Sequence, residues 1–195
     1  MRFDFNSACV YGRLVIIVMD EKGYIQIYTG DGKGKTTAAI GQSIRAAGSG
    51  IPVLFVQFLK DGTSSEMNIL KNLPNIQVDY ATENFGFYKT MTDETKQKAQ
   101  TAYTRLLLRN IQLVMQAEKR MLLVLDEIMA AYQFGFIEKE PFLEFLSKKP
   151  EQLEIVMTGR NPPKELLDIA DYITVMQKEK HPFDKGIKAR EGIEF

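Results

Sequence analysis

The sequence predicts an α/β fold in which a mainly parallel β-sheet is flanked by helices. Short apolar runs rich in β-branched residues alternate along the chain with longer segments of helical periodicity. The run at residues 52–58 is almost continuously apolar, which suits a strand buried on both faces of a parallel sheet. Strands that alternate with helices imply right-handed crossovers and helices on both faces. Because ligands of such sheets bind at the carboxyl ends of the strands, functional residues are expected there.

Each element is predicted from its own residues and from the signals that bound it. The first strand, residues 25–29, ends in a glycine-rich loop, and the helix at residues 35–48 ends at two nearby glycines. A weaker strand at residues 76–80 follows a proline, and residues 121–125 form a strand closed by two acidic residues. Further strands are expected at residues 155–158 and 172–176, and further helices at residues 141–148 and 163–170.

The longest helical segment is residues 93–119. Thr92 is placed to cap its start, and two acidic residues in its first turn interact favourably with the helix dipole. Apolar residues recur in it at intervals of three or four or their multiples. They predict one buried face, made of Ala99, Tyr103, Leu106, Leu113 and Ala117.

Length and composition limit the class of protein. The chain has 195 residues, 45% of them hydrophobic and 26% charged, which suits one globular domain. Its 25 basic and 25 acidic residues balance, which argues against nucleic acid as a partner, because such proteins carry excess positive charge. The single cysteine, Cys9, cannot form an internal disulfide, so a reducing cytoplasmic location is expected. The longest apolar run, residues 14–19, is far too short to cross a membrane.

The loop between the first strand and the first helix has the pattern of a nucleotide-binding P-loop. Residues 29–36, T-G-D-G-K-G-K-T, lie between a strand and a helix, as a Walker A motif requires. The glycines let backbone N–H groups turn toward an anion, and the helix N-terminus adds its positive end. Lys35 supplies a positive charge to phosphate oxygens, and the Thr36 hydroxyl can reach Mg²⁺. Thr29 replaces the usual first glycine, but the order of strand, loop, lysine and helix favours a nucleotide site over a turn without a ligand.

The acidic pair after the fourth strand matches the second half of such a site. Residues 122–127, L-L-V-L-D-E, form an apolar strand that delivers Asp126 and Glu127 to its carboxyl end. A hard cation beside phosphates needs oxygen ligands, which these carboxylates supply. A buried strand ending in surface acids is the alternative, and the P-loop in the same chain favours the metal-binding interpretation.

The residues around the loop resemble the P-loop type of ATP:corrinoid adenosyltransferases. That family shows the same missing first glycine and the same G-x-G-K-G-K-T-T-A run, here residues 30–38. Further stretches match in order: V-Q-F-L-K at 56–60, E-M-N at 66–68, L-D-E at 125–127, T-G-R at 158–160 and the C-terminal residues 181–195. The resemblance covers about residues 23–195, which are therefore expected to form one adenosyltransferase domain. Residues 1–22 are then an N-terminal extension.

The resemblance implies a three-layer, RecA-like P-loop NTPase fold and an enzyme, a transferase. The implied reaction moves the 5′-deoxyadenosyl group of ATP to the cobalt of reduced corrinoid, cob(I)alamin, in adenosylcobalamin synthesis or salvage. The cobalt attacks C5′ of the ribose, and inorganic triphosphate leaves. Lys35 is the implied catalytic contact, and Thr36, Asp126 and Glu127 are the implied ligands of Mg²⁺. The implied nucleotide-binding residues are Gly30, Asp31, Gly32, Lys33, Gly34, Lys35, Thr36, Thr37 and Arg160.

The family also uses an aromatic pair after the third strand to displace the lower axial ligand of the corrinoid. The matching segment is residues 81–88, in which Phe85 and Phe87 are the candidates for a catalytic role. The alternative is that these aromatic residues pack under the long helix. The only histidine, His181, is expected to have a structural hydrogen-bonding role.

The resemblance further implies a homodimer and an electron donor that reduces the cobalt, with a flavoprotein as one option. Residues 14–19 could add an edge strand or cover a partner's site. Two other functions remain open from the residues alone. A P-loop ATPase or small-molecule kinase would release ADP, and a corrinoid or nucleotide chaperone would bind without turnover.

Overall fold

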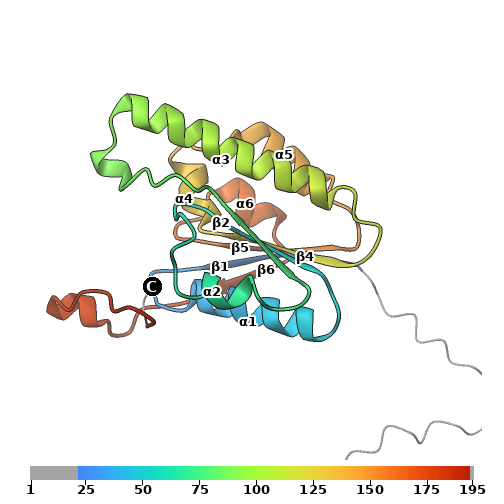
Figure 1. Cartoon of the computed structure of the whole chain (residues 1–195), viewed down its shortest axis with the longest axis horizontal. Coiled ribbons are helices and arrows are strands. Elements are labelled where there is room, and N and C mark those ends of the chain that lie inside the picture. The colour runs from blue at the N-terminus through green and yellow to red at the C-terminus, as the bar shows by residue number, and fades with distance from the viewer. Residues whose placement is uncertain (1–21, 194–195) are drawn as a thin grey trace, which may run out of the picture.

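The computed structural model describes residues 22–193, and its centre is a six-stranded, all-parallel β-sheet (Figure 1). The strand order is β3-β2-β4-β5-β1-β6. The strands are β1 (Ile25–Thr29), β2 (Val53–Gln57), β3 (Ile76–Tyr80), β4 (Met121–Asp126), β5 (Leu153–Thr158) and β6 (Tyr172–Val175). Every adjacent pair is parallel, so the predicted α/β class with a parallel sheet is confirmed.

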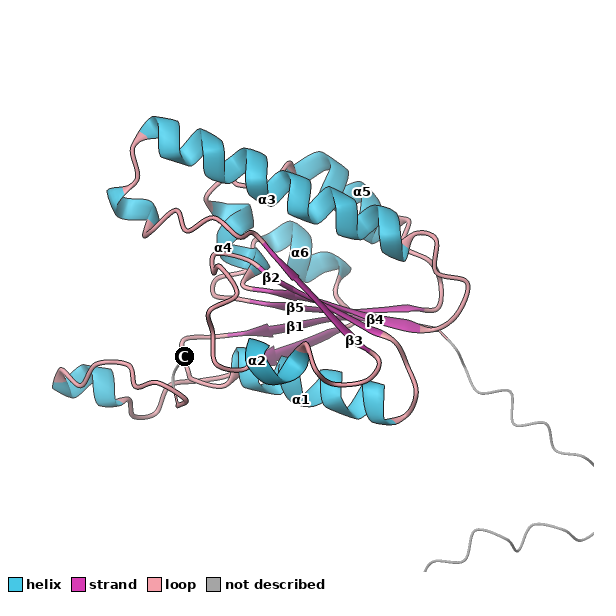
Figure 2. Cartoon of the chain, viewed as in Figure 1, coloured by secondary structure: helices cyan, strands magenta, loops and turns pink. Residues whose placement is uncertain are grey.

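Helices cover both faces of the sheet, which gives the three layers expected (Figure 2). One face carries α1 (Lys35–Gly48) and α2 (Met67–Leu70). The other face carries α3 (Asp93–Val114), α4 (Ile128–Gln133), α5 (Lys139–Ser147) and α6 (Lys164–Ile169). Two single-turn 3₁₀ helices, η1 (Tyr88–Thr90) and η2 (Pro182–Lys185), lie in the connecting and C-terminal segments.

Alternate side chains of one strand pack into the two helical layers. Leu54 and Val56 of β2 belong to the core under α3 to α6, whereas Val53 and Phe55 belong to the core under α1 and α2. All residues of β2 and β5 are buried, as expected for central strands covered on both faces. The loops at the carboxyl edge of the sheet are therefore anchored on buried strand ends.

The long helix α3 is shorter than its sequence pattern predicts. It ends at Val114, and the expected continuation to residue 119 is wrong, because Ala117 lies in a turn after the helix. Leu113 is 41% exposed, so its predicted place on the buried face is also wrong. In the last turn of α3 the buried residue is Val114. Leu113 points elsewhere, because adjacent residues of a helix point about 100° apart. The predicted cap is present, since Thr92 accepts a hydrogen bond from the backbone N–H of Thr95 at 3.2 Å.

Two short helices, α2 and α4, were not expected from the sequence. α2 has four residues and α4 has six, which are too few to show a 3.6-residue period. β4 ends at Asp126, and α4 begins directly after Glu127, which is its N-cap. The acidic pair therefore lies at the junction of a strand and a helix.

After β6 the chain leaves the body of the molecule. Residues 176–193 run past the P-loop and project outward, with η2 near their far end (Figure 1). Between residues 22 and 193, no helix is long and apolar enough to cross a membrane. The strand proposed at residues 14–19 lies outside the described residues.

Candidate active site

The phosphate loop joins the end of β1 to the start of α1 at the carboxyl edge of the sheet. Gly34, the N-cap of α1, has a φ of 115°, and Gly30 has a φ of 106°, both in the region that favours glycine. No acidic residue lies in the first turn of α1, so the positive end of the helix is not neutralised from within. This arrangement leaves backbone N–H groups available to an anion.

The segment after β6 packs so closely against the loop that two of the loop glycines have no space for a side chain. The N–H of Gly32 donates to the carbonyl of Met176 at 2.7 Å. A Cβ placed on Gly32 would lie 2.6 Å from that carbonyl oxygen, and one on Gly30 would also collide with it. The N–H of Lys178 donates to the Asp31 carboxylate at 3.1 Å. The loop is therefore held on its outer side by residues 176–178.

Lys35 is buried beneath the loop. Its ammonium group donates hydrogen bonds of 2.8 Å to the carbonyl oxygens of Gly30 and Gly32. Burial lowers the pKa of Lys35, and the positive charge of Arg160 lowers it further. The predicted cation is thus present in the loop, with the loop carbonyls as its partners.

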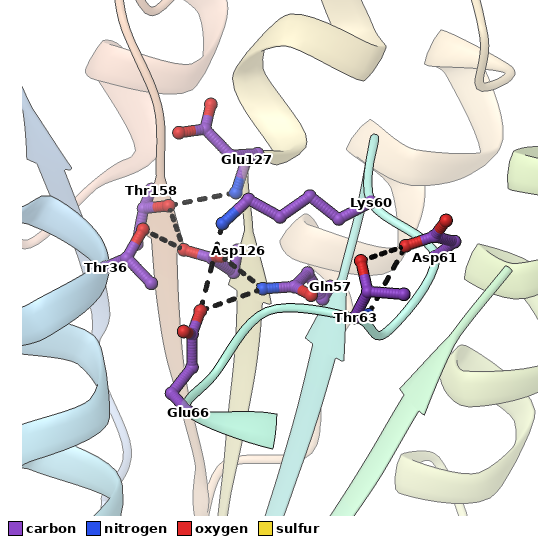
Figure 3. A network of polar contacts seen from close by, with 9 residues as sticks. All are labelled: Thr36, Gln57, Lys60, Asp61, Thr63, Glu66, Asp126, Glu127 and Thr158. Carbon is purple, nitrogen blue, oxygen red and sulfur yellow. Dashed lines mark hydrogen bonds and ion pairs between the residues drawn. The ribbon is translucent and has the colours of Figure 1, made fainter. Parts of the chain in front are cut away.

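A hydrogen-bond network connects the P-loop to the end of β4 (Figure 3). The hydroxyl of Thr36 donates to Asp126 Oδ1 at 2.9 Å, and the hydroxyl of Thr158 donates to the same oxygen at 2.8 Å. Thr158 also accepts from the N–H of Glu127 at 2.9 Å. Thr36, Asp126 and the backbone of Glu127 are therefore connected through Thr158 of β5, whereas the Glu127 carboxylate points away from Asp126 (Figure 3).

The acidic pair occupies an unusual environment for two carboxyl groups. Asp126 is fully buried, and burial raises its pKa even though hydroxyl groups donate to it. Burial also raises the pKa of Glu127, with the charge of Asp126 as the second cause. Glu127 has a φ of 60°, a left-handed conformation that is strained for a residue with a side chain. Strain and buried charge at one point are typical of functional sites.

These residues fit a magnesium ion bound together with a nucleotide. Within residues 22–193 there is no group of three or more His, Cys, Asp or Glu residues that could hold a metal alone. Mg²⁺ in nucleotide sites is usually held by one or two carboxylates together with substrate phosphates, so an all-protein cage is not required. Asp126, Glu127 and the Thr36 hydroxyl are the oxygen-bearing groups here that could contribute to such a partial set of ligands.

A cavity of about 260 Å³ opens beside the loop. It is lined by the P-loop, by Glu127 and Arg160, and by residues of the C-terminal segment. Arg160 follows β5 and is exposed, with its backbone carbonyl accepting from Gln133 at 2.8 Å. His181 Nδ1 accepts from the N–H of Phe183 at 3.1 Å, the structural hydrogen-bonding role that was expected for it. The C-terminal segment is therefore one wall of the cavity beside the phosphate loop.

The aromatic segment after β3 separates the two candidate phenylalanines. Phe85 packs on α3, with its ring centroid 5.6 Å from that of Tyr103. Phe87 is 85% exposed. Next to it, Tyr88 stacks on Phe134 at 4.1 Å. Packing under the long helix therefore accounts for Phe85 but not for Phe87.

Several polar residues of the site had no role assigned from the sequence: Gln57, Lys60, Glu66 and Thr158. Gln57 pairs in register with Asp126 across β2 and β4, and its amide nitrogen lies 3.4 Å from Asp126 Oδ2. Gln57 Oε1 is the buried side-chain atom among residues 22–193 that has no hydrogen-bond partner. A polar residue that ends an apolar strand beside the acidic strand is the signal that could have identified Gln57 and Thr158.

Together, the strand–loop–helix with Lys35 and Thr36, and the acidic pair on a nearby strand, define a P-loop nucleotide-binding protein. Comparison with known proteins narrows the class. Residues 21–195 match the family described as ATP:corrinoid adenosyltransferase BtuR/CobO/CobP. The chain belongs to this family of transferases, and the resemblance noted in its sequence is confirmed.

Curated relatives carry the same description. The chain is 35% identical over 179 residues to a corrinoid adenosyltransferase of Sinorhizobium sp, covering 90% of this chain and 82% of that protein. It is 33% identical over 178 residues to a corrinoid adenosyltransferase of Escherichia coli (strain K12), an alignment that covers 90% of this chain and 87% of that protein. It is 35% identical over 186 residues to the corrinoid adenosyltransferase CobA of Salmonella typhimurium (strain LT2), an alignment that covers 90% of this chain and 87% of that protein. Among solved structures it is similar to EssC (ATPases 2 and 3) from Geobacillus thermodenitrificans, at 14% identity and a TM-score of 0.46, covering 89% of this chain and 35% of that one.

Proposed function

We propose that this protein transfers the 5′-deoxyadenosyl group of ATP to the cobalt of a reduced corrinoid and releases inorganic triphosphate. The observation that carries the proposal is the match of residues 21–195 to the adenosyltransferase family. The buried lysine and the glycine-rich loop of this chain support it, because they form a cradle suited to a triphosphate.

The protein's part in the reaction is binding, orientation and charge stabilisation, since the corrinoid supplies the nucleophile. Cobalt(I) donates an electron pair to C5′ of the ribose, and the C5′–O bond breaks with its electrons remaining on the triphosphate. Lys35 and the backbone N–H groups of the loop would stabilise that charge, with Lys33, Thr37 and Arg160 as further contacts. Asp31 would act by holding the loop, because its carboxylate accepts the N–H of Lys178.

The proposal includes a magnesium ion held by Thr36, Asp126 and Glu127 together with phosphate oxygens. When bound, the ion would supply positive charge to the triphosphate. Thr36 and Thr158 support this assignment, because their hydroxyl groups fix the orientation of the Asp126 carboxylate.

Phe87, with Phe85 behind it, is proposed to meet the corrinoid and to displace its lower axial ligand. The exposure of Phe87 supports this role, because a large apolar ring in water is stabilised when a ligand covers it. Family membership also supports a homodimer, an external electron donor such as a flavoprotein, and a cytoplasmic location. Residues 23–195 would form the catalytic domain and residues 1–22 an extension of it.

The test is a single-turnover reaction of the protein with ATP, Mg²⁺ and chemically reduced cob(I)alamin. We expect a light-sensitive alkylcobalt spectrum and one triphosphate released for each cobalt alkylated. ADP and phosphate without alkylated cobalt would instead identify a P-loop ATPase or kinase. Binding of both substrates without a cobalt–carbon bond would identify a chaperone.

A further inference from the structure

A second lysine reaches the site from the loop after β2. Lys60 follows Phe58, whose N–H donates to the carbonyl of Asp126 at 2.9 Å, so this loop is attached to the end of β4. Leu59 has a φ of 59°, in the left-handed region that is strained for leucine. The strained turn directs the Lys60 side chain toward Asp126 (Figure 3). Backbone strain of this kind persists only where the surrounding structure holds it in place.

The ammonium group of Lys60 lies among carboxylates. It is 3.8 Å from Glu66 Oε1, and its positive charge lowers the pKa values of Asp126 and Glu127 against the effect of their burial. The side chain of Lys60 is 33% exposed, and its nitrogen makes that one ion pair and no hydrogen bond in the described structure. Lys35, by contrast, is buried and donates two hydrogen bonds. Lys60 is therefore the more exposed of the two cations and the one with fewer polar contacts.

Glu66, the ion-pair partner of Lys60, is itself bonded to Gln57. Glu66 Oε1 lies 3.3 Å from the amide nitrogen of Gln57, which also faces Asp126. Gln57 is buried at the end of β2. These two residues connect Lys60 to the acidic pair through fixed partners, so they act as positioning residues for the Lys60 ammonium.

An open space separates Lys60 from the phosphate loop. A cavity of about 690 Å³ is lined by Gly34, Thr36 and Thr37 on the loop side and by Lys60 and Glu66 on the opposite side. An anion bound to the loop N–H groups would therefore have Lys60 across the cavity from it. The negative charges that interact with Lys60 in the protein are carboxylates, and a bound polyphosphate would offer it denser negative charge.

We infer that Lys60 is a second cationic contact of the triphosphate, opposite the P-loop lysine. The inference rests on the proposed function, because the charge that Lys60 stabilises develops when the C5′–O bond breaks. In that step cobalt(I) gives an electron pair to C5′ and becomes cobalt(III), and the electron pair of the C5′–O bond adds one negative charge to the leaving triphosphate. Two ammonium groups on opposite sides of the leaving group stabilise that charge more than one does.

The experiment compares Lys60→Met, which keeps the length of the side chain without its charge, with Lys60→Arg, which keeps the charge. Lys71→Met, at an exposed lysine of the same segment, is the matched control. Tripolyphosphate is titrated into each protein by calorimetry without divalent metal, and kcat and KM for ATP are then measured with cob(I)alamin. We expect Lys60→Met to bind tripolyphosphate about tenfold more weakly and to lose kcat, because a charged contact is removed. Lys60→Arg should keep most of the affinity, and Lys71→Met all of it.

Wild-type affinity for tripolyphosphate in folded Lys60→Met would overturn the inference. So would a lower melting temperature with unchanged affinity, since a purely structural lysine gives that result. If Lys60→Met does not fold, Lys60→Gln answers the same question. The two proposals fail separately: if wild-type protein alkylates cobalt and Lys60→Met binds normally, only the inference fails. If wild-type protein never alkylates cobalt, the proposed function fails, and the titration still shows whether Lys60 contacts a polyphosphate.

Discussion

The phosphate side of the site and the aromatic segment beside it are built in opposite ways. On the phosphate side, Lys35 donates to two loop carbonyls at 2.8 Å, Thr36 donates to Asp126 at 2.9 Å, and Asp126 is fully buried. In the aromatic segment, η1 has no buried residue and Phe87 is 85% exposed. The difference is that the polar side chains of the phosphate side are already held by protein partners, whereas Phe87 has little protein contact. Substitutions on the two sides should therefore fail in different ways.

The largest effect is expected on the phosphate side, from Lys35→Ala. Removing one charged contact from a developing anion typically costs about 10²–10³ in rate. We expect that loss in kcat for adenosyl transfer, measured at saturating ATP with cob(I)alamin. Folding is checked by circular dichroism, because Lys35 also bonds two loop carbonyls. A folded variant with near-normal kcat would show that Lys35 is not a transition-state contact.

Phe85→Ala should behave as a core substitution. Its ring packs on Tyr103 at the surface of α3, and only part of it is buried. Truncation should lower the free energy of unfolding by about 2 kcal/mol, below the range for fully buried phenylalanine. Urea denaturation measures this change. Rates from cob(II)alamin and from cob(I)alamin should fall together, and unchanged stability would place Phe85 outside the core.

Glu127→Gln should stabilise the protein while weakening its metal site. Burial and Asp126 raise the pKa of Glu127 above its ordinary value of 4.5, so the folded state binds a proton there more tightly than the unfolded state. The ionised Glu127 therefore costs stability above its folded pKa, and this cost disappears as the pH falls below 4.5. At pH 8 the melting temperature should rise by about 2–4 °C, corresponding to about 1 kcal/mol.

Two measurements check that trade-off. The gain in melting temperature should shrink as the pH is lowered, because the wild-type carboxyl then takes up its proton. The Mg²⁺ concentration for half-maximal activity should increase in Glu127→Gln. An equal gain at every pH would mean that charge is not the cause, and an unchanged Mg²⁺ requirement would remove Glu127 from the metal site.

Phe87→Ala is expected to change stability least. An exposed ring makes few contacts, so the free energy of unfolding should stay within about 0.5 kcal/mol of wild type. The ratio of the rate from cob(II)alamin to the rate from cob(I)alamin should nevertheless fall about fivefold, the size of one lost aromatic contact. Only the reaction that starts from cob(II)alamin requires an axial ligand to be displaced. An unchanged ratio would show that Phe87 does not act on that ligand.

Much of the fold follows from patterns that the sequence makes visible. The buried runs of β2 and β4 and the capped start of α3 are local signals, and each was placed within a residue or two. The end of α3 departs from the prediction because the periodic apolar pattern continues into a turn, where Ala117 no longer belongs to the helix. The helices α2 and α4 are too short to carry a period at all.

The residues of the site also divide into those with a local sequence signal and those without one. Thr36, Asp126 and Glu127 could be grouped because they belong to two motifs whose spacing has a known meaning. Lys60 and Glu66 could not, because their places depend on which strands are neighbours and on the strained turn at Leu59. Strand order and left-handed backbone at a leucine are consequences of the assembled sheet, and no local pattern encodes them.

The contact between Met176 and the phosphate loop has a consequence for how this protein can be recombined with its relatives. The carbonyl oxygen of Met176 occupies the space that a side chain on Gly30 or Gly32 would need, and it accepts the N–H of Gly32. The two segments are about 145 positions apart in the sequence yet fit one another atom by atom. A chimaera that takes its loop from one parent and its C-terminal segment from another would combine surfaces that were never matched. Functional chimaeras should therefore inherit both segments from the same parent, wherever else the crossover points fall.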